Sequence, residues 1–422
     1  MNDICIDIDY SQVYKHGQRI GGDVFLLSKS DAGNIVTATL SDGLGSGVKA
    51  NVLASLTTHM ANKMSFSAMD INRSAEIIMD TLPVDREKGI SYSTFTIARV
   101  TFSDDKSYIH VSLIEYDNPE SLRFRGADPL NWDRTANTLN RQKAVKKETV
   151  YSSEFDLQPG DRLIYFSDGV AQSGVRLGSV VYDEARGVYT FKQKAPDAGT
   201  SEVGPQGWGV DSVREFVRKQ LRANPDISSR DLSRAIVTQA CTYDDQHPND
   251  DITCVVVGVR KPRRTLIVTG APRNRDSDRR LAEIISNYEG SIIVCGGTTA
   301  KIVARELRRQ ILPDHSPAGE LPPCSTIAGI DLVTEGMLTL SAAADRLSRK
   351  TLLKDMPEDA ARRIIRILRD TDQVQFIVGT QINDETSDPV LAARIGVRMP
   401  VIDQMTRALE ELYFKEVEVS YL

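Results

Sequence analysis

The chain has 422 residues, of which 41% are hydrophobic and 26% are charged, as in ordinary globular proteins of two or three domains. The net charge of −6 gives no electrostatic reason to expect nucleic-acid binding. Five scattered cysteines without a Cys-x-x-Cys pair argue against a disulfide framework or a zinc site. The acidic, alternating N-terminus does not resemble a secretory leader, and no apolar run of about 18 residues predicts a membrane span. We therefore expect a reduced, cytoplasmic protein.

The first 260 residues predict a mixture of strands and helices. Strand patterns occur at 24–27, 34–40, 93–102, 108–116, 162–166 and 252–259. Helical spacing of apolar residues occurs at 48–64, 71–82, 209–222 and 229–241. Residues 123–147 are polar and basic, so we expect an exposed excursion there, and 172–208 form a long insertion rich in glycine and charge.

Arg260–Arg264 is charged, contains Pro262 and separates two strand patterns, so we place a domain boundary there. The predicted domains are residues 1–262 and 263–422. Behind the boundary, predicted strands alternate with predicted helices, a pattern typical of βαβ units and a parallel sheet. The strands are expected at 265–269, 291–295, 373–378 and 417–421, and the helices near 276–287, 299–311, 339–348 and 357–369.

Four aspartates stand where a strand ends or a short motif begins. Asp42 ends an apolar strand, and the glycines that follow it allow a sharp turn before a helix. A carboxylate and a bare backbone carbonyl can therefore face a cation together. Asp168 follows another apolar strand, and Asp250 precedes one. Each could be a plain turn or strand cap, but their recurrence predicts an all-oxygen site for hard divalent cations, formed by Asp23, Asp42, Asp168 and Asp250.

These motifs together resemble the metal-dependent Ser/Thr protein phosphatases of the protein phosphatase 2C class. Within that class they resemble the SpoIIE-like branch of bacterial signalling phosphatases, over about residues 15–260. The resemblance implies an α+β fold, an α-β-β-α sandwich, with the smaller α/β domain behind it. The segments that carry it are Gly21-Gly22-Asp23, Asp42-Gly43-Leu44-Gly45-Ser46-Gly47-Val48-Lys49-Ala50, Leu163-Ile164-Tyr165-Phe166-Ser167-Asp168-Gly169-Val170 and Asp250-Asp251-Ile252-Thr253.

The resemblance also implies a binuclear Mn²⁺ or Mg²⁺ centre in a cleft at the strand ends. Asp42 would bridge both ions and Gly43 would lend its carbonyl. Asp23 would hold one ion, and Asp168 with Asp250 would hold the other. Such a centre activates water for in-line attack on phosphorus, so no covalent phosphoenzyme is needed.

Arg19, four residues before Asp23, is expected to bind the substrate phosphate, with an ordinary surface arginine as the alternative. Catalysis would then rest on Asp42, Asp168 and Arg19. The chain departs from the family at 115–120, where a small turn with glycine and histidine is usual. In this branch a helical element often switches the site, and the helices after Gly47 and near Asn72–Leu82 are the expected places for it.

In the second domain, a predicted strand runs into Gly296-Gly297-Thr298-Thr299 and a helix start. Free N–H groups at a helix N-terminus suit an anion, and the turn faintly resembles that of sugar-phosphate sensor domains in DeoR-type regulators. An ordinary connection with a threonine N-cap is the alternative. Loops at Gly270–Pro272 and Gly379–Gln381 are expected at the same sheet edge. This domain would sense a small anion or bind a partner.

Three functions are compatible with these patterns. The leading hypothesis is a Ser/Thr phosphatase acting on a phosphoprotein and regulated by its C-terminal domain. The resemblance implies a STAS-type anti-sigma-factor antagonist as substrate, and a homodimer is a further expectation. The second hypothesis is a catalytically weak metal-binding scaffold that signals through its C-terminal domain. The third, a nucleotide-binding enzyme, lacks Walker and Rossmann sequence endings.

Overall fold

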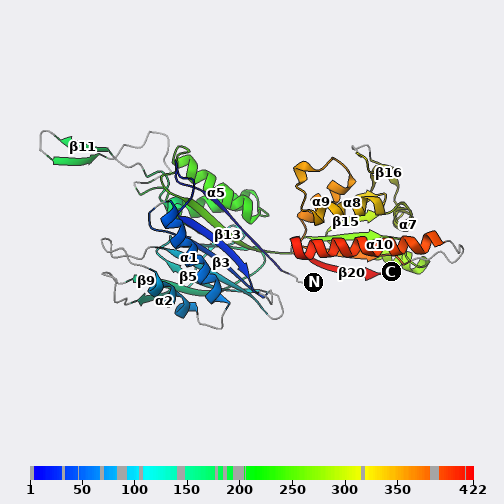
Figure 1. Ribbon diagram of the computed structural model, residues 1–422, viewed down its shortest axis with the longest axis horizontal. Helices are drawn as coiled ribbons and strands as arrows, with labels where there is room; N and C mark the ends of the chain where they lie inside the picture. Colours follow the sequence, from blue (N-terminus) through cyan, green and yellow to red (C-terminus); the bar gives the residue numbers. More distant parts are fainter. Residues whose placement is uncertain are drawn as a thin grey trace. The chain divides into compact units, whose positions relative to one another are not determined.

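The computed structural model divides the chain into two compact units, Asp3–Lys261 and Pro262–Leu422, shown as ribbons in Figure 1. Within the described residues, no helix combines the length and the apolar character that crossing a membrane requires. The structure describes residues 4–30, 34–45, 47–66, 71–82, 93–103, 108–139, 148–175, 179–183, 188–192, 204, 206–314, 319–380, 389–413 and 415–422.

Two antiparallel sheets form the centre of the first unit. The first sheet consists, in spatial order, of β1 (Cys5–Val13), β13 (Ile252–Arg260), β10 (Asp161–Phe166), β6 (Leu122–Arg125) and β7 (Asp128–Leu130). The second consists of β2 (Asp23–Lys29), β3 (Ile35–Asp42), β4 (Phe95–Phe102), β5 (Ile109–Tyr116), β9 (Glu148–Leu157) and β8 (Thr135–Leu139). A separate hairpin pairs β11 (Ser179–Asp183) with β12 (Val188–Lys192).

Helices cover the outer face of each sheet, as α5 over β13 and α1 beside β3 show in Figure 1. One apolar core lies between the sheets, where the Tyr165 hydroxyl donates to the Ala38 carbonyl at 3.0 Å. Two further cores lie beneath the helices. The expected α-β-β-α sandwich is therefore confirmed. The helices are α1 (Val48–Ser65) and α2 (Ile71–Thr81) on the second sheet, and α3 (Asp168–Ala171), α4 (Val210–Ala223) and α5 (Ser229–Tyr243) on the first.

The described part of the excursion predicted at 123–147 is mostly exposed or half-buried, as expected, but it also contributes the strands β6, β7 and β8, which the sequence did not predict. Leu122 and Phe124 are buried, while the alternating Arg123 and Arg125 both pair with the carboxylate of Asp161. The basic side chains therefore mark the outward face of a strand and not a loop. Residues 140–147 lie outside the described part of the chain. The sequence analysis did not predict strands β1 and β9.

The second unit is built on one seven-stranded sheet. Five neighbouring strands of this sheet are parallel, which confirms the expected βαβ pattern. The two remaining strands lie at one edge and are antiparallel. The spatial order is β16 (Ile311–Pro313), β17 (Ser325–Ile327), β18 (Ile330–Thr334), β15 (Ser291–Cys295), β14 (Arg264–Thr269), β19 (Gln373–Val378) and β20 (Glu416–Tyr421).

The helices of this unit pack against two separate apolar clusters. α6 (Arg275–Asn287) and α7 (Gly297–Leu307) share one of them, and α8 (Met337–Ser348), α9 (Ala360–Arg369) and α10 (Pro389–Arg407) share the other. A 3₁₀ turn at Leu353–Asp355 and a π-turn at Ala408–Leu412 complete the described elements.

Candidate active site

Asp23 and Asp42 face each other across two paired strands. Asp23 begins β2, Asp42 ends β3, and the antiparallel register makes them direct partners. The negative charge of Asp23 raises the pKa of the Asp42 carboxyl group. The Asp23 side chain is buried, and its Oδ2 accepts a 2.5 Å hydrogen bond from the Thr253 hydroxyl. Its Oδ1 is buried without a hydrogen-bond partner among the described residues. The pairing therefore places one uncompensated carboxylate oxygen at the end of the sheet.

The turn after Asp42 is packed tightly against α1. A Cβ at Gly43 would lie 2.1 Å from the Ala50 carbonyl oxygen, so only glycine fits there. The backbone of Asp42 is held on its other side, where its carbonyl accepts from the Thr94 N–H at 2.9 Å. Gly45 and Gly47 have φ values of 103° and 74°, which favour glycine. The expected strand–turn–helix geometry is present; Ser46 of the motif lies outside the described residues.

Asp168 is the first residue of the short helix α3, directly after β10. The Gln172 side-chain amide, one turn later, donates to Asp168 Oδ2 at 2.8 Å. A Cβ at Gly169 would lie 2.1 Å from the Asp251 carbonyl oxygen, so α3 packs directly on the start of β13. The segment Ser167–Gly169 therefore places Asp168 at the end of the sheet where β13 begins.

The Asp250–Asp251 pair divides into two roles. Asp251 is buried and accepts backbone N–H groups from Lys15 at 2.8 Å and Gly22 at 2.5 Å. Asp250 is half-exposed, with the Lys15 ammonium 4.0 Å from its Oδ1. Backbone donors therefore compensate the charge of Asp251, which is not free to hold a cation. Asp251 instead fixes the loop that leads into Asp23.

The four aspartates form one electrostatic cluster. Burial is the largest cause of a raised carboxyl pKa at each of them. The negative charges of neighbouring aspartates raise these pKa values further, and the pKa of Asp42 is raised by Asp23, Asp168 and Asp250 together. In the described part of the chain, no group of three or more His, Cys, Asp or Glu side chains is yet arranged to hold a metal ion. The carboxylates thus lie within range of one another's charge without forming a finished coordination shell.

A cavity of about 750 Å³ opens beside this cluster, lined by Asp42, Asp168 and Gln172 together with the turn that follows β5. Residues 115–120 of that turn differ from the family's usual pattern. Here the turn is locked by Asn118, whose side-chain oxygen accepts from the Thr94 hydroxyl at 2.6 Å. Asp117 adopts a left-handed φ of 55°, a conformation that Asp and Asn tolerate better than most residues. An aspartate therefore occupies the bend where a small turn was expected.

Arg19 lies in the connection between β1 and β2 and is exposed. It forms no hydrogen bond or ion pair with another described residue, so no contact ties it to the cluster. The sequence did not single out Gln172, Asp244 or Asp251 as positioning residues. Only Asp251 carries a signal, because it stands inside the motif that begins at Asp250.

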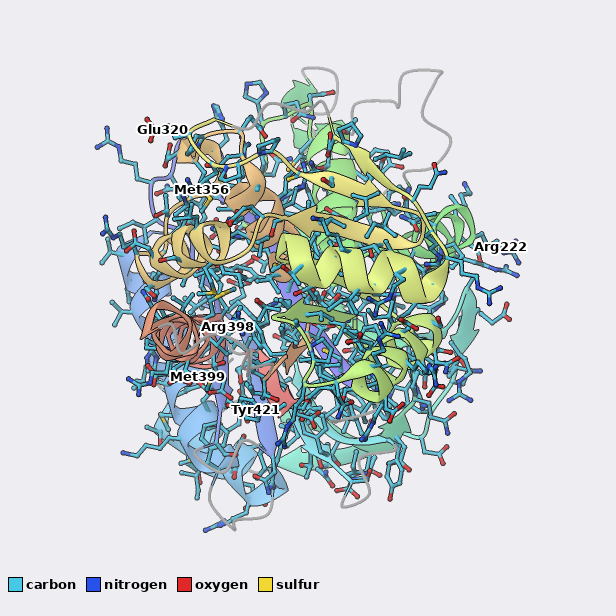
Figure 2. The ribbon with its side chains drawn as sticks, turned by 90° about the vertical axis from the view of Figure 1, so that its right-hand side faces the viewer. Arg222, Glu320, Met356, Arg398, Met399 and Tyr421 are labelled. Carbon is cyan, nitrogen blue, oxygen red and sulfur yellow. The ribbon has the colours of Figure 1, made fainter. Side chains whose placement is uncertain are left out.

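A second candidate site lies at the carboxyl ends of the parallel strands in the C-terminal unit. Gly296 is the N-cap of α7, with φ 120° and no side-chain cap, so the alternative of a threonine N-cap is wrong. The Gly296 N–H donates to the Thr334 carbonyl at 2.9 Å. Arg398, labelled on α10 in Figure 2, donates to the Gly379 carbonyl at 3.1 Å. Gly270 has a φ of 86°, and a Cβ there would lie 2.9 Å from the Gly379 carbonyl oxygen, so the position favours glycine as well.

The family model of Stage II sporulation protein E (SpoIIE) matches residues 33–260, more than half of the chain, and the chain therefore belongs to the SpoIIE family. It is a phosphoprotein phosphatase, a hydrolase, and family membership implies dependence on divalent cations. No match was found among curated proteins.

Three solved structures are similar to this chain. The phosphatase domain of SpoIIE from Bacillus subtilis is 16% identical with a TM-score of 0.41, covering 62% of this chain and 95% of that one. RsbX in complex with magnesium is 15% identical with a TM-score of 0.37, covering 61% and 100%. The SiaA-PP2C domain of Pseudomonas aeruginosa is 14% identical with a TM-score of 0.37, covering 58% and 84%.

Proposed function

We propose that the phosphatase chemistry of this chain depends on a centre for two divalent cations, Mn²⁺ or Mg²⁺. Asp23, Asp42, the carbonyl of Gly43, Asp168 and Asp250 would hold them. The observation that carries the proposal is the Asp23 Oδ1 atom, buried without a hydrogen-bond partner among the described residues inside a cluster of like charges. Buried carboxylates are costly unless they are paired or bind a cation, so the residues present fit such ions.

The bound cations would supply an activated water and offset the charge on the phosphoryl oxygens. The chain's own residues orient the reactants. The Thr253 hydroxyl donates directly to the Asp23 carboxylate. Asp251 accepts the Gly22 N–H and so fixes the backbone next to Asp23. Arg19, free of described partners, would bind the substrate phosphate with its planar set of donors. Asp42 and Asp168 line the cavity in which the phosphoryl group would lie.

The substrate in this proposal is phosphoserine or phosphothreonine on a signalling protein. The resemblance to the SpoIIE-like branch points to a phosphorylated STAS-type anti-sigma-factor antagonist. The C-terminal unit would regulate the enzyme, with a small anion such as a sugar phosphate bound at the N-terminus of α7. The glycines at the strand ends and the uncapped first turn of α7 support that part of the proposal.

The proposal is tested by hydrolysis of p-nitrophenyl phosphate by the full chain with Mn²⁺, with Mg²⁺ and with chelator. We expect metal-dependent turnover. Asp42→Asn should lower it by at least about 100-fold, since the variant would lose a carboxylate ligand of the cation centre. Arg19→Ala should raise KM, because it removes a phosphate contact and no metal ligand.

Turnover that persists in chelator, or an Asp42→Asn variant with full activity, would contradict the metal centre. Binding of Mn²⁺ without turnover, even on phosphoprotein substrates, would favour the metal-binding scaffold instead.

A further inference from the structure

The two halves of the candidate centre are held by different kinds of structure. Asp23 and Asp42 belong to neighbouring strands of one sheet, and their backbones are fixed by the register of β2 and β3. Asp168 stands on a helix of four residues, and Asp250 lies in a loop with 49% of its side chain exposed. The first pair is therefore preorganised by the sheet, whereas the second pair needs support from elsewhere.

That support comes from Asp244, a buried residue at the end of α5. Its Oδ1 accepts the Gly174 N–H at 2.7 Å, close behind α3. Its Oδ2 accepts the N–H of Asn249 at 3.2 Å, and the Asn249 side-chain amide donates to Oδ1 at 3.2 Å. Asn249 directly precedes Asp250. One carboxylate thus ties the segment that carries Asp168 to the segment that carries Asp250.

A second set of contacts fixes α3 itself. The Gly209 N–H donates to the Ala171 carbonyl at 2.8 Å, and the Trp208 N–H donates to the Ser173 carbonyl at 2.9 Å. Trp208 is buried against the rings of Phe216 and Tyr243, so this clamp is anchored in the core beneath α4 and α5. Because the backbone of α3 is held by these contacts, the Asp168 carboxylate can move only by rotation of its side chain.

Gln172 removes that freedom. Its amide donates to Asp168 Oδ2 and leaves Oδ1 available to a ligand. A donor that orients a ligating carboxylate raises metal affinity because the carboxylate is already ordered when the ion arrives. Gln172 also lines the cavity beside Asp42 and Asp168, so it acts at the edge of the site.

We propose that Gln172 and Asp244 are positioning residues that set the affinity of the cation held by Asp168 and Asp250. This cation binds in a separate and weaker step than the cation held by Asp23 and Asp42. It is weaker because the Asp250 side chain is 49% exposed and the Lys15 ammonium lies 4.0 Å from its carboxylate. The inference rests on the proposed metal centre.

The test is calorimetric titration of the metal-free full chain with Mn²⁺. We compare wild type with Gln172→Ala, which changes no charge, and with Asp244→Asn, which keeps the shape but replaces an acceptor. Asp245→Asn is the matched control, because Asp245 is the exposed neighbour of Asp244 and its left-handed φ of 52° suits asparagine. Wild type should bind in two steps. Both test variants should weaken the weaker step by about tenfold or more and leave the tighter step unchanged, and the control should change neither.

A single binding step in wild type, or variants that shift both steps equally or neither, would overturn the inference and leave the metal centre standing. Absence of any Mn²⁺ binding in wild type would instead contradict the proposed centre itself. If Asp244→Asn does not fold, Gln172→Ala still decides the question, since Gln172 is an exposed side chain whose loss should not unfold the protein.

Discussion

The Asp23–Asp42 pair shows how single residues can serve a site at the expense of the fold. The Asp23 carboxyl group is buried and that of Asp42 is partly buried, and like charges nearby raise the pKa of both. Without a cation, ionisation of either carboxyl group lowers the stability of the folded protein, because the charged form is disfavoured in the folded state. Natural proteins commonly retain such destabilising residues where function requires them. The cost should therefore be measurable in the metal-free protein.

Asp42→Asn should stabilise the metal-free chain at neutral and alkaline pH. Folded-state pKa values raised above the ordinary carboxyl value mean that the native state binds protons more tightly than the unfolded chain. The stability contributed is complete below about pH 4. It is lost as the pH rises through the folded pKa of Asp23, about 7, and then through the still higher value of Asp42.

The measurement is the Tm of wild type and Asp42→Asn in chelator between about pH 5 and about pH 8. The variant should gain on wild type as the pH rises, by about 2–4 °C for each kcal/mol recovered. Added Mn²⁺ should raise the Tm of wild type more than that of the variant. A variant that melts below wild type at the upper end of this range would show that Asp42 supports the fold and is not strained by its neighbours.

At the scale of elements, the candidate site is positioned by close contacts between elements at which a side chain with a Cβ would not fit. α1 approaches the turn after β3 at Gly43, and α3 approaches the start of β13 at Gly169. In both cases the close atom is a backbone carbonyl, which cannot rotate away as a flexible side chain could. The elements that carry Asp42 and Asp168 are therefore docked through glycine, and a larger residue must displace the whole element.

Gly169→Ala should move α3 away from β13 and cost about 1–3 kcal/mol of stability through overpacking. The displacement should also lower phosphatase activity, because Asp168 directly precedes this contact. Gly204→Ala is the control within the same unit, since a Cβ there meets only the Gly207 carbonyl oxygen at 3.8 Å. Denaturant unfolding and turnover should both stay near wild type in the control, within about 0.5 kcal/mol for stability. An equally stable and active Gly169→Ala variant would contradict the docking argument.

For the whole molecule, the sequence predicted local elements well and contacts between distant segments poorly. Helical spacing at 48–64 correctly predicted that α1 is a helix, but its large apolar residues Val52 and Leu56 are exposed, and small residues such as Ala54 and Ala61 form its buried face. Alternation of strands and helices after the domain boundary predicted the parallel sheet. Periodicity reports which face of an element is buried. It could not show that Asp23 and Asp42 are register partners, because register depends on the turn between their strands.

Other features of the site were hidden for the same reason. Asp244 and Gln172 belong to no motif, and their roles depend on hydrogen bonds to segments brought close only by folding. The charges of Arg123 and Arg125 indicated an exposed excursion and gave no sign of the strand β6, because their partner Asp161 is distant in sequence. Polar residues whose partners lie far along the chain are the ones that composition misplaces.

The two units have separate apolar cores, so the proposed regulatory role of the C-terminal unit can be tested by truncation. Every hydrophobic cluster of the described residues belongs to one unit alone. A chain ending at Lys261 should therefore fold and melt cooperatively, because a domain with its own core can fold independently. If the C-terminal unit regulates the enzyme, turnover of p-nitrophenyl phosphate should differ between the full and the shortened chain.

The decisive comparison adds a panel of sugar phosphates to both chains. An anion bound at the N-terminus of α7 should change the rate of the full chain and leave the shortened chain unaffected, because residues 262–422 are missing from the latter. An equal effect on both chains would indicate competition at the phosphatase site, since a sugar phosphate carries the same phosphoryl group as the substrate. Identical kinetics for both chains, with and without the panel, would assign the C-terminal unit a role other than control of turnover.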